Sequence, residues 1–570
     1  ASLDVQSAIS TALRTLPPEM PAPPSFRKIN PSDFGIIFIA LSSDILPLSA
    51  INEYADPVLA QRISTIDGVA QVSVFGAQKY AVRVQVNPDA LASRGIGIED
   101  VARTIRAGNT NQPTGTISGT HRVFTIETTG KLSQAAGYAE EIVAWRGAAP
   151  VRLKEVATVV DSVENTKIAT RVDAHRAVVL AIYRQPGGNT VRIAEAIKEG
   201  LPSFRQMLPP TVNMSVLYDR SVMIRESVND VQFTLLLASA LVVMVIFLFL
   251  RNISATLIAS LALPISIIGT FALMYPLGFS LDNLSLMALT LAVGFVVDDA
   301  IVMLENIVRH MEKGEKPLEA ALKGSREIGF TILSMTVSLI AVFIPIAFMG
   351  GIVGRLLHEF AITIGAAILV SGFVSLTLTP MMCSRFLRPE SERAHGRLFN
   401  LSERFFARLH GFYRTTLGWT LEHHRVTFSV FLATVAGSGL LYFVVAKDFL
   451  PSEDSGRVFA FTEGAQDSSF ESMARFQGQV AAIVATDPAV RTFMSSVGAS
   501  GNRVTTNSGL IFIALKPRRE RDASADEVIR RLRPKVADIP GIRVFLQNPP
   551  VIRVGGRLSK AQYEYTLQSL

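Results

Sequence analysis

The sequence predicts a membrane protein in which an α-helical bundle is joined to soluble α+β domains built from ferredoxin-like βαβ units. Six hydrophobic runs, each close to the roughly 20 residues needed to cross a bilayer, follow one another in the middle of the 570-residue chain. The mean hydropathy is +0.34, and 18% of the residues are charged, which is low for a soluble protein. Before and after the hydrophobic runs, short strand-like segments alternate with helical ones.

The soluble region before the first hydrophobic run extends to about residue 221 and contains an internal repeat. Residues 51–76 and 470–498 share one order of helix, turn, strand and glycine. Residues 194–218 and 528–546 share another, of helix, proline and strand. Duplicated halves are a recurrent transporter architecture, although chance similarity between βαβ units gives the same pattern.

The six hydrophobic runs are predicted to be membrane spans. They cover Phe233–Leu250, Thr256–Leu273, Leu284–Leu304, Phe330–Met349, Phe360–Pro380 and Val426–Val445. Basic residues gather after the first, third and fifth spans, and the linker at 384–425 carries eight arginines. By the positive-inside rule these connections are cytoplasmic, so both soluble regions lie on the opposite face, the periplasm of a double-membrane bacterium.

Charge and cysteine content narrow the class of protein further. The net charge of +7 is concentrated in the linker, which favours a membrane face and argues against nucleic acid. Part of the linker forms an amphipathic pattern that fits either a helix on the membrane surface or a solvated connector; its apolar residues are Leu398, Leu401, Phe405, Leu409 and Phe412. The single cysteine, Cys383, has no partner for a disulfide and no metal-ligand cluster around it.

The most informative feature is a pair of neighbouring acids, Asp298 and Asp299, inside the third span. A charge at that depth costs at least about 2.5 kcal/mol, so these carboxylates are protonated or paired with a cation. We therefore interpret them as a proton relay rather than as a salt-bridged pair in a soluble core. Adjacent helical positions diverge by about 100°, so their partners must come from neighbouring helices. Glu305, further along the helix, fits a solvated acid better than a proton-release group.

Several motifs, in the correct order, resemble those of resistance-nodulation-division exporters. The segment Gly294–Asn306, which contains the acid pair, resembles the fourth span of their hydrophobe/amphiphile multidrug branch. Phe247–Asn252 resembles the first cytoplasmic turn, Leu376–Cys383 the end of the sixth span, and Phe449–Gly456 the start of the second porter region. The likeness covers essentially the whole chain and is greatest to the B and C subunit type of heteromeric multidrug transporters.

The resemblance implies a proton-driven antiporter of amphiphilic drugs that confers antibiotic resistance. Such a protein is a homo- or heterotrimer in lipid of the bacterial inner membrane, and it works with a periplasmic adaptor and an outer-membrane channel. It is not an enzyme and uses the proton gradient instead of a cofactor or metal. In the family the cation that pairs with the acids is a lysine of a second half. The chain begins at Ala1 and ends in a strand-like run, so we expect a fragment truncated at both ends.

The resemblance also divides the chain into expected domains. The expected order is residues 1–34, tail of the first porter subdomain; 35–79 and 164–221, second porter subdomain; 80–163, docking subdomain; 222–383, five membrane helices; 384–425, cytoplasmic linker; 426–445, the span that opens the second repeat; and 446–570, partial second porter region.

The resemblance offers candidate drug-pocket residues in the porter region. Phe75 matches a pocket phenylalanine of the family, and Phe512 is similar to another, although both also fit ordinary strand core. In the glycine-rich loop at residues 497–502, Val497 and Ala499 stand where the family usually has phenylalanine. This departure predicts an altered substrate range.

Four alternatives remain at this point. A metal exporter of the same superfamily should show methionine pairs, whereas Met20, Met207, Met214 and Met473 are scattered. An intramembrane aspartyl protease needs two carboxylates that share a proton, usually from separate helices. A non-pumping subunit of a heteromeric exporter would keep the fold, and a membrane scaffold or receptor would not need the acid pair.

Overall fold

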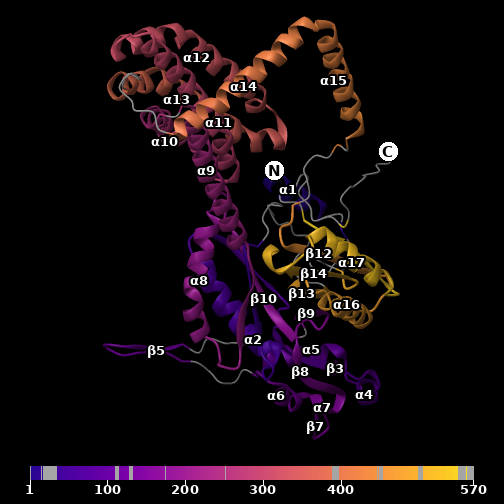
Figure 1. Ribbon diagram of the computed structural model, residues 1–570. Coiled ribbons are helices and arrows are strands. Elements are labelled where there is room, and N and C mark those ends of the chain that lie inside the picture. The colour runs from indigo at the N-terminus through magenta and orange to yellow at the C-terminus, as the bar shows by residue number, and fades with distance from the viewer. Residues whose placement is uncertain are drawn as a thin grey trace. The chain divides into compact units, whose positions relative to one another are not determined.

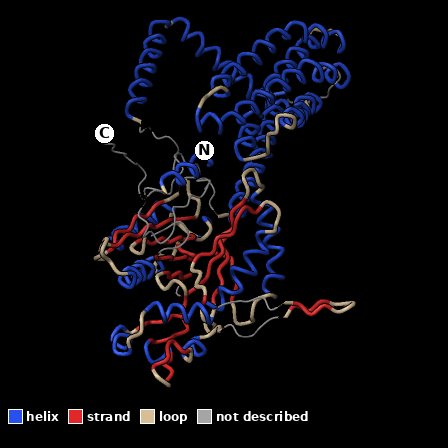
Figure 2. Tube along the Cα trace, turned by 180° about the vertical axis from the view of Figure 1, so that it is seen from behind, coloured by secondary structure: helices blue, strands red, loops and turns tan. Residues whose placement is uncertain are grey.

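The protein is described by a computed structural model with two compact units (Figure 1). The described residues are 2–13, 16, 35–109, 115–126, 132–173, 175–250, 252–387, 397–445, 447, 453–498, 505–549 and 560. One unit comprises Ala1–Met223 together with Ser452–Leu570, and the other comprises Ile224–Pro451. Helices make up the second unit, and the strands all belong to the first (Figure 2). The chain is therefore a helical membrane region plus α+β domains, as the sequence predicts.

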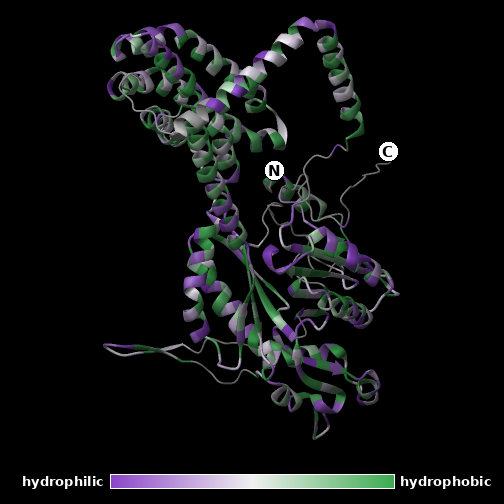
Figure 3. Cartoon of the chain, in the orientation of Figure 1, coloured by the Kyte–Doolittle hydropathy of each residue, from purple (hydrophilic) through white to green (hydrophobic). Residues whose placement is uncertain are grey.

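Six helices are long and apolar enough to cross a membrane, which confirms the six predicted spans. They are α9 (Arg220–Leu250), α10 (Ile253–Met274), α11 (Asn283–Glu312), α12 (Pro317–Ala347), α13 (Gly351–Phe386) and α15 (His424–Val444). Hydrophobic residues dominate these helices in Figure 3. Several begin at residues that suit a helix start: the Asn252 side chain caps α10, the Asp282 side chain caps α11, and Pro317 opens α12.

Helices α11 and α13 form the centre of the membrane unit. More than half of the most apolar window of each is buried, 56% in both cases, against 6% for α9 and none for α15. Helix α13 packs against α10, α11 and α12. Because both α11 and α13 are enclosed on several sides, a polar group on their facing surfaces is shielded from lipid as well as from water.

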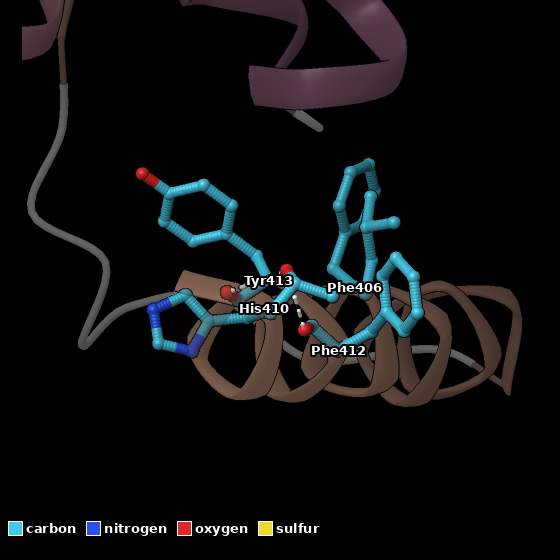
Figure 4. A pocket seen from close by; sticks show the side chains of 6 residues that line it. Phe406, His410, Phe412 and Tyr413 are labelled. Carbon is cyan, nitrogen blue, oxygen red and sulfur yellow. Dashed lines mark hydrogen bonds between the residues drawn. The ribbon is translucent and has the colours of Figure 1, made fainter. Parts of the chain in front are cut away.

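The basic linker forms helix α14 (Arg397–Glu422), which confirms a helix at this place. Of its predicted apolar positions, Phe405, Leu409 and Phe412 are exposed; the side chains of Leu398 and Leu401 lie outside the described residues. A shallow hollow on α14 is lined by Phe406, Leu409, His410, Phe412, Tyr413 and Thr416 (Figure 4). The exposed aromatic rings suit a helix that lies against lipid.

The soluble unit contains two α+β repeats with the same strand order. In the first, the strands are β1 (Ile37–Ser42), β2 (Val69–Phe75), β10 (His175–Arg184) and β11 (Asn213–Asp219), and the helical segments are α2 (Leu48–Tyr54), η1 (Ala55–Ala60), α3 (Gln61–Ser64) and α8 (Thr190–Gln206). The antiparallel strands lie in the order β11-β1-β10-β2. Apolar residues of the strands and of α2, η1, α3 and α8 form one buried core.

The second repeat is built in the same way and confirms the internal repeat seen in the sequence. It contains β12 (Arg457–Gly464), α16 (Phe470–Ala485), β13 (Val490–Gly498), β14 (Ser508–Leu515), α17 (Ala525–Ala537) and β15 (Ile542–Gln547). Its strands lie in the order β15-β12-β14-β13, which matches the first repeat strand for strand. Strand β9 (Ile168–Val172) pairs with both β10 and β13, so the two repeats share one continuous sheet.

A smaller part with its own core is inserted into the first repeat. Its strands β3 (Tyr80–Val86) and β8 (Ala157–Val163) pair along their whole length. The other elements are α4 (Pro88–Arg94), α5 (Ile98–Gly108), α6 (Ala135–Ala139), β6 (Ile142–Arg146), β7 (Ala149–Arg152) and α7 (Leu153–Val156). The hairpin of β4 (Thr116–Ser118) and β5 (Val123–Thr125) projects from this part and exposes apolar residues (Figure 2).

Two further elements of the soluble unit are short. Helix α1 (Ser2–Ala12) lies near the start of the chain, and the 3-10 turn η3 (Arg518–Glu520) precedes α17. Most of the expected first-porter tail, residues 1–34, and the whole of residues 446 and 448–452 lie outside the described residues.

The junction between β13 and the following loop depends on a glycine, and this gives a testable prediction. Gly498 has φ +90°, and an added Cβ would clash with the Lys167 carbonyl oxygen. Gly456 also has a positive φ, +65°, but open space around it. We expect Gly456→Ala to cost about 1–2 kcal/mol from backbone strain and Gly498→Ala about 2 kcal/mol more from the clash.

Thermal or chemical unfolding of both variants in detergent checks this expectation. Equal stability of the two variants would show that Gly498 does not lie close to the Lys167 carbonyl oxygen.

Candidate proton-relay site

The two acids of the predicted relay face different surroundings on α11. Asp299 is buried, with 3% of its surface exposed, whereas Asp298 is exposed on the surface of the described bundle. This divergence follows from the rotation of about 100° between adjacent helical residues. Among the residues that the structure describes, neither carboxylate has a basic nitrogen within the 4.0 Å limit of a salt bridge. The structure therefore contains one acid shielded from solvent and one directed outward.

Small residues bring α13 close to α11 around Asp299. Ala300 packs with Ala262 of α10 and Val374 of α13. About two turns earlier in α11, Ala292 packs with Ala367 of α13. The Ser371 hydroxyl donates a hydrogen bond of 2.8 Å to the Val296 carbonyl oxygen. These contacts fix the register of the two helices at the acid.

The two small residues singled out on the relay helix behave differently. Ala292 is buried against α13, as expected for a close helix approach. At Gly294 an added Cβ would meet nothing within 4 Å, so this glycine is not required by a described neighbour. Glu305 is exposed, which fits the solvated acid that we favoured.

The sequence analysis missed a second polar cluster at the end of α11. His310 is buried, with its Nε2 3.0 Å from Glu327 Oε2 and its Nδ1 3.4 Å from Glu315 Oε2. The Asn306 side chain donates to the Gly324 carbonyl oxygen at 3.0 Å. A hydrogen bond from Lys323 lowers the pKa of Glu315, in the turn between the helices. The cluster joins α11 to α12. A histidine on the same helix as the acids was the sequence signal for it.

The two candidate phenylalanines of the soluble unit lie in or beside an aromatic cluster. Phe512 is 2% exposed, and its ring centre lies 5.4 Å from those of Phe38 and Phe459 and 5.3 Å from that of Tyr218. Phe75 is half-buried at the margin of the same cluster. The described structure thus places Phe512 in the core of the sheet, whereas part of the Phe75 surface remains accessible.

Of the other two candidates, the structure describes only Val497, which is not accessible. Val497 is 1% exposed and belongs to the core of the second repeat. Ala499 lies outside the described residues. Arg457 lies beside the cluster with its guanidinium 5.4 Å from the Tyr218 ring centre, and burial lowers the pKa of this arginine. The charge and the rings together make this face of the sheet amphiphilic.

The first repeat is tied to the start of α9 by a partly buried ion pair. Asp219 ends β11, and Arg220 begins α9 with no residue between them. The Lys198 ammonium of α8 lies 2.7 Å from Asp219 Oδ2. The Ser221 backbone N–H and hydroxyl donate to Asp219 Oδ1 at 2.8 and 2.6 Å. The carboxylate therefore joins α8, β11 and the first turn of α9.

A buried acid in a bundle of membrane-capable helices, in a chain that also carries duplicated α+β repeats, is the organisation of a membrane transporter. The model of the AcrB/AcrD/AcrF family matches residues 1–570, so the chain belongs to this family. Its members are resistance-nodulation-division permeases, which are transporters and not enzymes. The predicted superfamily is confirmed, the protease alternative is excluded, and the chain is an inner-membrane protein.

The Lys198–Asp219 pair predicts a pH-dependent stability. Burial acts to raise the pKa of Asp219, but the bonds from Lys198 and Ser221 outweigh it, so the pKa lies below its ordinary value. A lowered pKa stabilises the fold above the unfolded-state pKa of about 3.9, and this gain is lost as the pH falls through the folded value. We expect Lys198→Met to cost about 1 kcal/mol at pH 7 and progressively less below pH 4.

Unfolding measured in detergent at pH 7 and at a pH below 4 tests this prediction. Arg192→Met on the same helix is the control, because Arg192 and Asp67 form a highly exposed pair whose loss should change nothing measurable. An equal cost of Lys198→Met at both pH values would contradict the role given to Asp219.

Proposed function

We propose that the chain is a subunit of a proton-driven exporter of amphiphilic compounds in the inner membrane of a double-membrane bacterium. The observation that carries the proposal is Asp299, buried at the centre of α11 and without a described cationic partner. An ionised carboxylate in such surroundings is costly, so proton uptake changes the free energy of this site by several kcal/mol. A site of this kind can drive a change in helix packing at each proton cycle.

The proton cycle needs a cation that approaches the acids in one state and leaves in another. The outward direction of Asp298 suits a partner on helices that are not part of this chain, which we expect to be a lysine of a second half. Protonation would remove the attraction between the carboxylates and this cation. The helices would then shift until the proton is released. The proton gradient supplies the energy, and the proposal involves no cofactor or metal.

The soluble unit suits the capture of substrate on the periplasmic side. We infer that its two repeats are ferredoxin-like, because both connect four antiparallel strands in the same order through two helical crossovers. Residues 35–79 with 164–221 and residues 446–570 are then porter regions. Residues 80–163, with a separate core, are the docking insertion.

Assembly into a trimer with an adaptor and an outer-membrane channel is part of the proposal. The exposed hairpin β4–β5 supports it, because Ile117, Val123 and Phe124 expose 61, 65 and 57% of their surface. An apolar hairpin of this kind is suited to burial against another subunit.

Amphiphiles fit the soluble unit better than metal ions do. Met214 is buried in the core of the first repeat and Met473 in that of the second, so these two do not form a pair. Met20 lies outside the described residues. The described residues contain no group of three or more His, Cys, Asp or Glu side chains placed to hold a metal. The partly accessible ring of Phe75, at the margin of the aromatic cluster, suits varied apolar substrates.

Replacement of Asp299 by asparagine tests the proposed function directly. In the intact transporter we expect Asp299→Asn to abolish drug resistance while expression and assembly persist, because the amide cannot bind and release a proton. Glu305→Gln, on the exposed face of the same helix, is the control and should keep full resistance. Unchanged resistance in Asp299→Asn would instead favour a non-pumping subunit or a scaffold.

The two phenylalanines are predicted to have separable roles. Phe512→Ala should lower the free energy of unfolding by about 3–5 kcal/mol, because it removes a fully packed ring. Phe75→Ala should cost less and change the relative efflux of bulky and small amphiphiles, since part of its ring is accessible. Unfolding in detergent and efflux of a set of dyes of different size check both effects. Unchanged substrate preference in Phe75→Ala would remove this residue from the pocket.

A further inference from the structure

One face of α13 carries buried hydroxyl groups at intervals of one helical turn. Ser371, Ser375 and Thr379 are spaced four residues apart and are 1, 0 and 1% exposed. Four-residue spacing places them one above another on the same side of the helix, over a length of about 12 Å. The face therefore presents a column of hydroxyls to the interior of the membrane unit.

Two of these hydroxyls lack the bond that such groups usually form in helices. A serine or threonine in an apolar helix commonly donates to the carbonyl oxygen four residues earlier. Thr377, on the exposed side of the same helix, does so at 2.7 Å to Phe373. Within the part of the chain that the structure describes, Ser375 Oγ and Thr379 Oγ1 are buried and have no hydrogen-bond partner at all. These hydroxyls are thus available to another polar group.

The column lies at the level of the buried acid. The bond from Ser371 to the Val296 carbonyl oxygen and the packing of Val374 on Ala300 show that α11 and α13 advance in the same direction, side by side. Ser375 therefore lies level with Asp299, and Thr379 lies one turn further toward the end that carries the basic loops.

A third helix contributes to the same polar region. Ser266 of α10 is fully buried, and its hydroxyl also has no partner among the described residues. Along α10, Ser266 lies between Ala262 and Gly269. Ala262 packs with Ala300 and Val374, and Gly269 contacts Val370, so Ser266 lies near the level of the acid. Hydroxyls from two helices thus flank the acid-bearing helix where Asp299 is buried.

On the other side of Ser371 the column is interrupted. Ala367 occupies the next position on this face and packs against Ala292 and Val296. A buried hydroxyl without a described partner recurs beyond it at Thr363, so the uninterrupted part of the column runs from Ser371 to Thr379, toward the basic end of the bundle.

We propose that Ser375 and Thr379 line a chain of ordered waters that carries protons between Asp299 and the basic, cytoplasmic end of the membrane unit. This inference rests on the proposed function. A buried hydroxyl without a partner is unfavourable, and a water molecule that bonds several polar groups relieves this cost. A hydroxyl both donates and accepts, so it can hold a water in either orientation during transfer.

Each transfer step along this chain conserves atoms and charge. The O–H bond of protonated Asp299 breaks as an O–H bond to the first water forms. Each water then passes one proton to the next, and the last proton leaves to bulk water. The serine and threonine hydroxyls keep their own protons and act as positioning residues for the waters.

The test compares variants of the intact transporter in proteoliposomes with an imposed pH gradient and a fluorescent amphiphilic cation as substrate. Ser375→Ala and Thr379→Val remove the hydroxyls, Ser375→Thr and Thr379→Ser retain them, and Thr377→Val is the matched control. We expect each hydroxyl deletion to slow transport about tenfold, the change expected for loss of one hydrogen bond in the limiting step. The ratio of rates in H2O and D2O should also rise in the deletions alone.

The hydroxyl-retaining variants and the control should transport at the rate of the parent protein. Full activity of both deletions, with an inactive Asp299→Asn, would overturn the water chain and leave the exporter function intact. Equal slowing by the retaining variants would show that packing is responsible, and would also overturn it. Full activity of Asp299→Asn would overturn both proposals.

Discussion

The cost of placing a carboxylate among apolar helices is the constraint on which the membrane unit depends. Asp299 is 3% exposed, and small residues of α10 and α13 close around its helix. The small residues permit this enclosure, and the enclosure in turn makes the ionised acid unfavourable. Packing and proton affinity are therefore coupled at this point, so a change in one must alter the other.

The soluble unit is held together by a strand that belongs fully to neither repeat. Strand β9 pairs with β10 of the first repeat and with β13 of the second. At its end Asp173, with φ 52°, accepts hydrogen bonds of 3.0 Å from the Thr492 hydroxyl and the Phe493 N–H. The aromatic cluster contains rings from both repeats, so it depends on the same junction. A rearrangement of the aromatic cluster would therefore also disturb this continuous sheet.

The sequence was sufficient for the features that depend on local pattern. The spans follow from apolar length, and the repeats follow from the order of helices, prolines and strands. The acid pair stands out because charge is rare in such helices. The sequence could not show that Asp299 is buried and Asp298 exposed, because this depends on where α13 packs. Phe512 and Phe75 likewise resemble each other in sequence, and their different accessibility depends on how the strands of the soluble unit pack.

Other features required the fold itself. Strand β9 is short and partly polar, and it becomes recognisable through its pairing with a strand more than 300 residues away in the chain. The buried hydroxyls of α13 look like ordinary serines and threonines of a span. Their significance comes from missing bonds, which a sequence does not record. His310 likewise acquires its two acidic neighbours through the packing of α12.

The direct passage from β11 to α9 has a mechanical consequence. Strand β11 and the first turn of α9 meet without a linker, and Asp219 is bonded there to both Lys198 and Ser221. A change in the direction of this first turn therefore requires that the bonds of Asp219 break or that β11 moves with the turn.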